Sequence, residues 1–385
     1  MSKRVKFLRI LYVLPLLLVL VLAGCSFNKD TSEAGKSMKV IKLGAILPLS
    51  GDAGAYGEQV QNVIDYQLVK VNEKYKDKGI KFEVIYEDGK CTGNDAVNAF
   101  QKLTEIDGVK FIIGGFCSSE TLAMIPLVKD GKVLLAGPGS SNPQIEKAND
   151  YVFSFAYSDN LTGEKLADEM SKYKKVAIIS EQNDYNIGLE NAWMESLKKY
   201  PDVKIVASEK YPKSGNDFRN VLEKVRAAQP DALLLNPNAG APGQSLIKQL
   251  SEIKDWNNYK LFGQIAYMNK STLALAPKTV EGMIIVDAPQ ISSEEFKSLK
   301  NSIESEKGTL GDLGDYFTAS TADNLDVMSS LIVELGEDPI AVRKALVSRD
   351  FSGYISKSFN FKNSSFTNVD AAVYVIKNNQ PELVK

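Results

Sequence analysis

Apolar residues in this chain alternate between short continuous runs and runs at helical spacing. Residues 40–47 are almost all apolar, which is typical of a strand covered on both faces. Between residues 60 and 71, apolar side chains recur with the spacing of one helix face. The pattern predicts further strands at 80–86, 109–113 and 133–136, and further helices at 96–103 and 120–129. This alternating β-α order predicts a parallel sheet with right-handed crossovers.

The same alternation begins again at residue 175. The pattern there predicts strands at 175–179, 203–207, 232–235, near 261 and at 283–286, with helices at 187–197, 218–227 and 244–253. It ends with helices around 294–305, 318–334 and 339–348 and with strands at 358–361 and 371–376. Neither a charge run nor a low-complexity linker separates the halves. The predicted fold class is therefore α/β, with two doubly wound sheets.

The first 24 residues have the pattern of an export signal. A basic stretch at residues 3–9 precedes an apolar stretch at 10–22, which is short for a membrane span of about 20 residues. The run Leu-Ala-Gly-Cys that ends at Cys25 resembles a bacterial lipobox, which predicts cleavage before Cys25 and its lipidation. The alternative is an uncleaved anchor helix. Residues 25–38 are polar and are interpreted as a flexible tether.

The remaining cysteines and the composition limit the classes of function that this chain can have. With Cys25 assigned to lipid, Cys91 and Cys117 are an even pair in an oxidising compartment, which favours a disulfide over two buried thiols. The formal net charge is −2, so nucleic acid is not an expected partner. The chain has no histidine, which excludes a Ser-His-Asp triad, and no metal-spaced cluster is visible. We therefore expect a protein without cofactor or metal that is not an enzyme.

Polar, glycine-rich loops follow the predicted strands. Ligands of open parallel sheets bind beyond the carboxyl ends of the strands. The loops at those ends are 48–57, 114–119, 137–142, 180–185, 236–240 and 263–267. Ser118 and Ser141 could bind an anionic group at helix N-termini, or could be simple N-caps.

Several of these motifs together resemble the type I periplasmic-binding-protein superfamily, leucine/isoleucine/valine-binding subgroup. The resemblance extends from about residue 39 to residue 376. The motifs that carry it are 43–51 with Tyr56 and Gly57, 86–88 before Cys91, 113–119, 138–143, 184–185 before Gly188, and 217–218.

The resemblance implies two Rossmann-like lobes joined by a hinge of three chain crossings. The crossings are expected near 156–160, 286–289 and 352–358. Lobe one would then comprise residues 39–157 plus 288–354, and lobe two residues 158–287 plus 355–385. Such a hinge closes on its ligand, and membrane subunits recognise the closed form.

The resemblance also implies ligand-binding residues. Ser118 would hold a ligand carboxylate, Ser141 would add a hydroxyl and Gly139 a backbone contact. The tyrosine of the first loop is Tyr56 and the covering tyrosine of lobe two is Tyr185. A second covering tyrosine of the family falls at Asn238, so that aromatic is missing here.

The main departure from the family lies at Ile265, where amino-acid-binding members have a glutamate that accepts the ligand's ammonium group. An ammonium group in a closed cleft without a partner would be strongly destabilised. Either another acceptor replaces the glutamate, with Asp184, Asp287 and Asp323 as candidates, or the ligand lacks an ammonium group. We expect a carboxylate at Ser118 and Ser141 beside an altered ammonium site.

These features favour an extracytoplasmic, lipid-anchored solute-binding protein of an ABC importer. Its expected partners are an amino acid or related small carboxylate, the ABC permease subunits, and the membrane through the lipid only. The alternative is a sensory receptor of the same fold. The chain ends at Lys385 soon after its last strand, without a signalling segment, which favours a free binding subunit. We expect this subunit to be a monomer.

Overall fold

The computed structural model describes residues 38–384 except 147, 214 and 312. A first sheet has the strand order β2-β1-β3-β4-β5, and each neighbouring pair is parallel. Its strands are β1 (Lys39–Leu47), β2 (Ile80–Asp88), β3 (Phe111–Gly114), β4 (Leu134–Gly137) and β5 (Val152–Ser154). The carboxyl ends of five strands therefore lie at one edge of this sheet.

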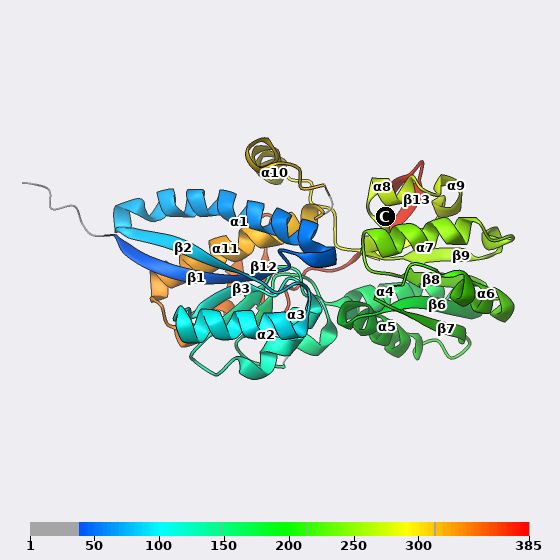
Figure 1. Ribbon diagram of the computed structural model, residues 1–385, viewed down its shortest axis with the longest axis horizontal. Helices are drawn as coiled ribbons and strands as arrows, with labels where there is room; N and C mark the ends of the chain where they lie inside the picture. Colours follow the sequence, from blue (N-terminus) through cyan, green and yellow to red (C-terminus); the bar gives the residue numbers. More distant parts are fainter. Residues whose placement is uncertain (1–37, 147, 214, 312, 385) are drawn as a thin grey trace, which may run out of the picture. The chain divides into compact units, whose positions relative to one another are not determined.

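Helices cover both faces of the first sheet because successive residues of β1 point to opposite sides. Leu43 and Ala45 pack with α1 (Gly54–Tyr75) and α11 (Asp315–Leu335), and Ile46 packs with α2 (Gly93–Gln101). Figure 1 shows α1 above the strands and α2 and α3 below them, and α11 packs against α1. The other helices of this part are α3 (Ser118–Met124), α10 (Glu294–Lys307) and α12 (Pro339–Leu346).

A second sheet has the order β14-β13-β10-β9-β8-β6-β7. The five strands from β6 to β10 are parallel, whereas β13 and β14 run antiparallel to their neighbours. Asn378 and Asn379 join β13 to β14 with positive φ, as in a tight hairpin turn. The strands are β6 (Lys175–Gln182), β7 (Lys204–Pro212), β8 (Ala232–Asn236), β9 (Lys260–Gly263), β10 (Ile284–Asp287), β13 (Ala372–Lys377) and β14 (Gln380–Leu383).

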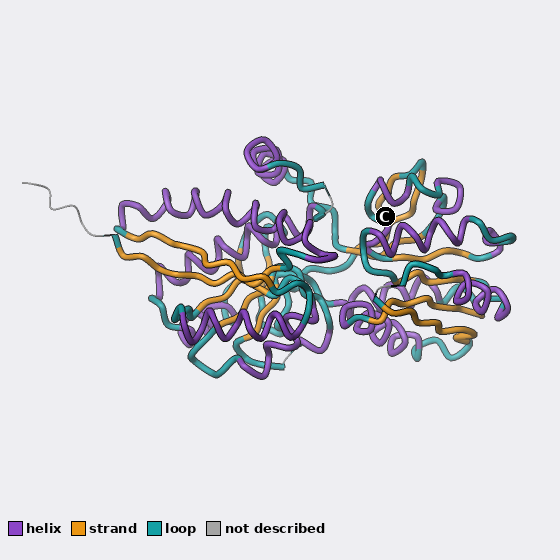
Figure 2. Tube along the Cα trace, in the orientation of Figure 1, coloured by secondary structure: helices purple, strands orange, loops and turns teal. Residues whose placement is uncertain are grey.

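The second sheet is also covered on both faces, so Figure 2 shows its strands between two groups of helices. Ile178 of β6 packs with α4 (Asp159–Met170) and α5 (Asp184–Leu197). Its neighbour Ile179 packs on the other side with α6 (Arg219–Ala228) and α7 (Ala241–Ser251). Two short helices, α8 (Lys270–Leu273) and α9 (Pro277–Val280), precede β10.

The predicted α/β fold with two doubly wound sheets is confirmed, and the differences concern single elements. The pattern missed β5, which has three residues, and α4, whose apolar positions are few. The strand predicted at 358–361 does not join a main sheet. It forms β12 (Phe359–Asn360), which pairs with β11 (Asp350–Phe351) as a separate two-stranded sheet.

Three of the predictions have no test in this structure. The signal peptide at 1–24, lipidation at Cys25 and nearly all of the tether at 25–38 lie outside the described residues. The lobe boundaries also stay a prediction. Of the helices that the structure describes, none is long and apolar enough to cross a membrane.

Candidate ligand-binding cavity

A cavity of about 110 Å³ lies where loops from the carboxyl ends of both sheets meet. This volume can hold several water molecules and therefore a small organic molecule. All seven residues expected to contact a ligand line it: Tyr56, Ser118, Gly139, Ser141, Tyr185, Asn238 and Ile265. The structure thus brings these residues together, and their contact with a ligand stays a prediction. We call Ser118, Gly139 and Ser141 the first wall, and Tyr185, Asn238 and Ile265 the second wall.

Ser118 is a hydrogen-bond donor for the cavity. Its side chain is buried, and its Oγ accepts a hydrogen bond from the Asn142 N–H at 3.4 Å. A hydroxyl that accepts this bond still carries its own O–H, which can donate to a ligand oxygen. The N-cap of α3 is Cys117, so Ser118 is not the simple N-cap that its sequence position also allowed.

Ser141 is a hydrogen-bond acceptor for the cavity, whereas Ser118 is a donor. Its Oγ donates a hydrogen bond to Asp159 Oδ2 at 2.8 Å, and both side chains are buried. Because its proton is directed at Asp159, the oxygen of Ser141 has lone pairs left for a ligand N–H or O–H. Burial raises the pKa of Asp159 well above its ordinary value, although the Ser141 bond opposes this, and the charge of Asp287 raises it further.

Asp287 is the buried carboxylate of the lining. It ends β10, its side chain is 6% exposed, and Tyr157 donates its O–H to Asp287 Oδ1 at 2.7 Å. Burial raises its pKa to about 6, although the bonds from Tyr157 and from the Ala288 N–H lower it. No Lys or Arg of the described chain forms an ion pair with it or contributes to this shift.

The other two candidate aspartates differ from Asp287. Asp184 lines the cavity but is exposed, and its backbone carbonyl accepts a hydrogen bond from Asn142 Nδ2 at 2.6 Å. Asp323 is buried away from the cavity, and its carboxylate accepts hydrogen bonds from the N–H groups of Tyr354 and Ile355, each at 2.8 Å. The structure therefore places Asp287 alone among the three as a buried group of the lining.

The first wall is fixed by a disulfide and a buried glutamate. Cys91 and Cys117 form a disulfide with their Cα atoms 5.3 Å apart, as the even pair of cysteines favoured. Glu120 lies beneath it and accepts hydrogen bonds from the Cys91 N–H at 3.0 Å and the Cys117 N–H at 2.9 Å. Burial raises the pKa of Glu120 to about 7, although these two bonds lower it. A Cβ at Gly89 would lie 2.3 Å from Glu120 Oε1, so the carboxylate requires glycine there.

The second wall is held by amide and carboxylate hydrogen bonds. Asn186 Nδ2 donates to Asn236 Oδ1 at 2.9 Å, and Gln264 Nε2 donates to the Pro237 carbonyl at 2.5 Å. Glu181 Oε2 accepts hydrogen bonds from the Asn238 N–H at 3.0 Å and the Tyr211 O–H at 3.3 Å. These buried polar groups hold the loop that presents Asn238 to the cavity.

Aromatic rings supply much of the remaining lining. Tyr56 stacks on Phe116 with ring centroids 6.3 Å apart, and Phe116 meets the edge of Phe317 at 5.6 Å. Sequence reasoning missed Phe116, Phe317 and Tyr157 as cavity residues. Phe116 lies in the loop at 114–119, so strand-end position could have found it. No local signal marks Phe317 or Tyr157, because long-range packing brings them to the cavity.

Comparisons with known proteins agree with this architecture. A family model described as "Periplasmic binding protein" matches residues 40–381. A leucine-, isoleucine-, valine-, threonine-, and alanine-binding protein of Pseudomonas aeruginosa is 24% identical over 341 residues, which cover 85% of this chain and 88% of that protein. An uncharacterized protein of Methanocaldococcus jannaschii is 29% identical over 189 residues, 46% of this chain. The match spans less than half of that relative, at 45% of its length.

A solved structure shows the same fold. It is a solute binding protein of an ABC transporter from Rhodopseudomonas palustris HaA2 in complex with p-hydroxybenzoic acid. Its TM-score is 0.79 at 17% identity, and the match covers 90% of this chain and 97% of that one.

Proposed function

Because the chain belongs to the periplasmic binding protein family, we propose that it is the extracytoplasmic solute-binding subunit of an ABC importer. Its ligand is an amino acid or a related small carboxylate, held between the two walls of the cavity. The observation that carries this proposal is the cavity itself, since loops at the strand ends of both sheets line it. A site built from two sheets suits a protein that closes on a ligand and opens to release it.

The first wall favours a carboxylate as part of the ligand. Ser118 is a buried residue of the lining and offers an O–H. A hydrogen bond from a neutral donor to a charged acceptor is stronger than one between neutral groups. The amino-acid-binding relative and the complex with p-hydroxybenzoic acid are both named for ligands with a carboxyl group. We therefore assign the carboxylate to Ser118 and the rest of the ligand to the aromatic lining.

Contacts between the walls support closure on the ligand. Asn142, beside the first wall, bonds to the carbonyl of Asp184 at the start of α5, and a Cβ at Gly188 would lie 2.5 Å from Asn142 Nδ2. These contacts require the loop of Asn142 to pack closely against the start of α5. Ligand in the cavity would stabilise this arrangement, which is the form that permease subunits would recognise.

The experiment that tests the function is ligand capture. The mature protein is purified gently and denatured, and the released small molecules are identified by mass spectrometry. We expect one small carboxylate, released chemically unchanged, since the proposed function is binding without catalysis. Adding it back should reduce the radius of gyration in small-angle X-ray scattering. Absence of a captured molecule, together with an unchanged radius for every amino acid or aromatic acid tried, would contradict the proposal.

Lipid attachment at Cys25 is the remaining part of the proposal. The Leu-Ala-Gly-Cys run after a short apolar stretch supports it. Replacing Cys25 with Ser should release the protein from the membrane fraction of the expressing cells. A Cys25→Ser protein that stays in the membrane with its full N-terminus would instead favour an uncleaved anchor helix. We expect the released protein to be monomeric in size-exclusion chromatography with light scattering.

A further inference from the structure

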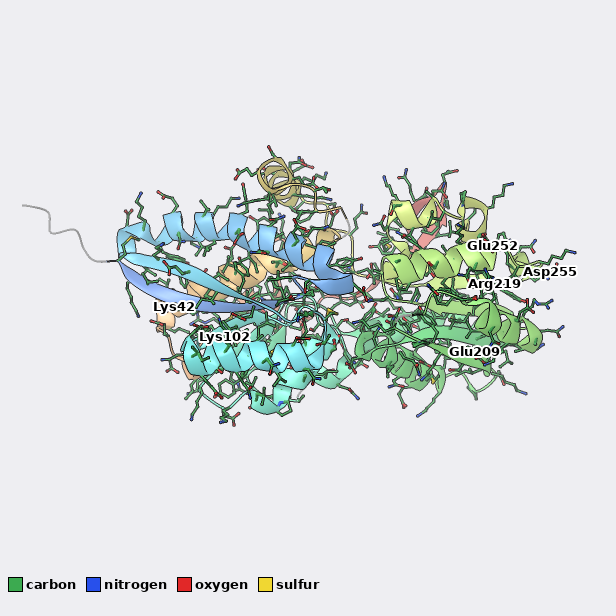
Figure 3. The ribbon with its side chains drawn as sticks, in the orientation of Figure 1. Lys42, Lys102, Glu209, Arg219, Glu252 and Asp255 are labelled. Carbon is green, nitrogen blue, oxygen red and sulfur yellow. A yellow bond between two sulfur atoms is a disulfide. The ribbon has the colours of Figure 1, made fainter. Side chains whose placement is uncertain are left out.

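Many charged side chains at the surface of this protein form ion pairs, whereas two buried carboxylates near the cavity form none with the residues that the structure describes. Surface residues such as Lys102, Glu209 and Arg219 have partners of opposite charge, and Figure 3 shows them on the outer faces of the helices and strands. Two buried carboxylates differ from these: Asp287 lines the cavity, and Asp159 accepts a hydrogen bond from Ser141 of the lining. Asp287 and Asp159 are 6% and 2% exposed, and neither forms an ion pair with a Lys or Arg that the structure describes.

We propose that Asp287 is the cation-recognising residue of the cavity and that the ligand carries a protonated amine beside its carboxylate. This inference rests on the proposed function, because it requires that the cavity binds a ligand. In related amino-acid-binding proteins, a glutamate at the position of Ile265 accepts the ligand's ammonium group. We assign that role to Asp287 in this protein. The ligand class is then a zwitterion rather than a simple carboxylate.

The geometry leaves Asp287 with acceptor capacity toward the cavity. An ionised carboxylate has about four acceptor sites. The Tyr157 O–H and the Ala288 N–H use two of them. Asp287 lines the cavity, so its remaining capacity can be directed at a ligand. A carboxylate that is bonded to two donors on the protein side is held in place for a third donor on the ligand.

The charges around Asp287 make a cation the favoured ligand group. The titratable groups that interact with it are Asp159, Tyr157, Tyr185 and Tyr374, and all of these are neutral or negative. The single Lys or Arg among the described lining residues is Lys213, which interacts with Glu181. A buried carboxylate without a cation is costly, and a ligand ammonium group would offset that cost.

The two serines fix the orientation of such a ligand. Ser118 has an O–H to donate to the ligand carboxylate, whereas Ser141 directs its proton at Asp159 and accepts from the ligand. Ser141 and Asp287 therefore form an acceptor side of the cavity, opposite in polarity to Ser118. An amino acid presents a carboxylate and an ammonium group on one carbon, which matches a donor and two acceptors in a single small site.

The test compares ligands that differ only in the amine. Calorimetry would measure the affinity of the mature protein for leucine and phenylalanine, for their 2-oxo and 2-hydroxy analogues, and for 4-hydroxybenzoate. We expect the amino acid that binds to be preferred about 10- to 150-fold over its 2-oxo analogue, as for the loss of one charged hydrogen bond. Asp287→Asn should remove most of this preference and leave the affinity for the 2-oxo acid nearly unchanged.

The control variant is Asp326→Asn, on α11. Asp326 is a partly buried carboxylate outside the cavity, paired with Gln67 Nε2 at 2.8 Å, so its loss changes no cavity charge. It should keep the wild-type preference for amines. Circular dichroism of Asp287→Asn would exclude misfolding. If Asp287→Asn misfolds, a wild type that binds oxo acids as tightly as amino acids still overturns the inference.

The outcomes separate this inference from the proposed function. If oxo acids or 4-hydroxybenzoate bind as tightly as amino acids, the protein is a binding protein but Asp287 is not its cation site. A preference for amines that survives Asp287→Asn overturns the inference in the same way. If no probe binds, the molecule captured by mass spectrometry tests the inference. A captured molecule without a basic nitrogen overturns it. If nothing is captured either, the proposed function and this inference both fail.

Discussion

The two walls of the cavity rest on sheets with the same parallel order of strands, yet different interactions hold them. Beneath the first wall lie the Cys91–Cys117 disulfide and the buried carboxylate of Glu120. The second wall has amide hydrogen bonds and one carboxylate, Glu181, that accepts from Asn238 and Tyr211. Ser118 follows Cys117 directly, so the residue that we assign to the ligand carboxylate lies on the wall with the covalent link.

This difference indicates a division of roles. A binding group that is held in place before the ligand arrives loses less conformational entropy on binding. If the proposed function holds, the first wall would fix the ligand carboxylate and the loop of the second wall would move to cover the ligand. The following predictions test that division, from the largest expected effect to the smallest.

Removing the disulfide should give the largest effect. In the chain-entropy model, the Cys91→Ser, Cys117→Ser double variant should lose about 3–4 kcal/mol in the free energy of unfolding. Chemical denaturation of the mature protein without Cys25 measures this loss. Ligand affinity should fall as well, because Ser118 follows Cys117 directly. An unchanged stability would mean that the first wall does not depend on its covalent link.

Truncating Ser118 should weaken binding without unfolding the protein. Ser118→Ala removes one donor to the ligand carboxylate, at a cost of about 1.5–3 kcal/mol or roughly 10- to 150-fold in affinity. Calorimetry with the captured ligand measures this change. Ser119→Ala is the neighbouring control, since the Ser119 hydroxyl bonds to the Cys91 carbonyl at 3.0 Å. An equal loss of affinity in both variants would indicate a general disturbance of the loop.

Replacing Glu120 should change stability and its dependence on pH. Gln offers one acceptor and a donor where Glu120 accepts from two N–H groups, so Glu120→Gln should cost about 1–3 kcal/mol. Burial raises the pKa of Glu120 from 4.5 to about 7, so the folded protein retains a proton that the unfolded chain releases. Its contribution to stability is complete below pH 4.5 and is lost as the pH rises to about 7.

The measurement for Glu120 is denaturation of both proteins at several pH values between 4.5 and 7. The fall in stability over that range should be shallower in Glu120→Gln than in the wild type. Asp287 and Asp323 also have raised pKa values, of about 6 and about 7, so part of the slope should remain in the variant. Parallel curves would show that Glu120 titrates outside this range.

The smallest effect is expected in the second wall. Tyr211→Phe removes the weaker of two bonds that Glu181 Oε2 accepts, at 3.3 Å, and leaves the bond from the Asn238 N–H at 3.0 Å. The unfolding free energy should fall by about 0.5–1.5 kcal/mol, with little change in ligand affinity. A loss of affinity as large as that of Ser118→Ala would contradict the division of roles between the walls.

The sequence alone determined the fold class and the strand ends whose loops contribute to the cavity. Apolar runs such as 40–47 and 232–235 are strands because strands covered on both faces have few polar positions. The loops after the strands had to lie at the carboxyl edge of their own sheet, which placed Ser118 and Ser141 at one edge and Tyr185 at the other. That the two edges face each other was implied by the resemblance. The resemblance to the periplasmic binding proteins, read from the same motifs, is confirmed by the family model.

Only the tertiary structure decided how the polar groups of the cavity are paired. The sequence offered three aspartates of equal standing, and packing alone buried Asp287 in the lining, exposed Asp184 and turned Asp323 toward the N–H groups of Tyr354 and Ile355. It also gave Ser118 and Ser141 opposite hydrogen-bond polarity through Asn142 and Asp159. The physical reason is that hydrogen-bond direction and burial depend on neighbours far apart in the chain, which local patterns of apolar residues do not record.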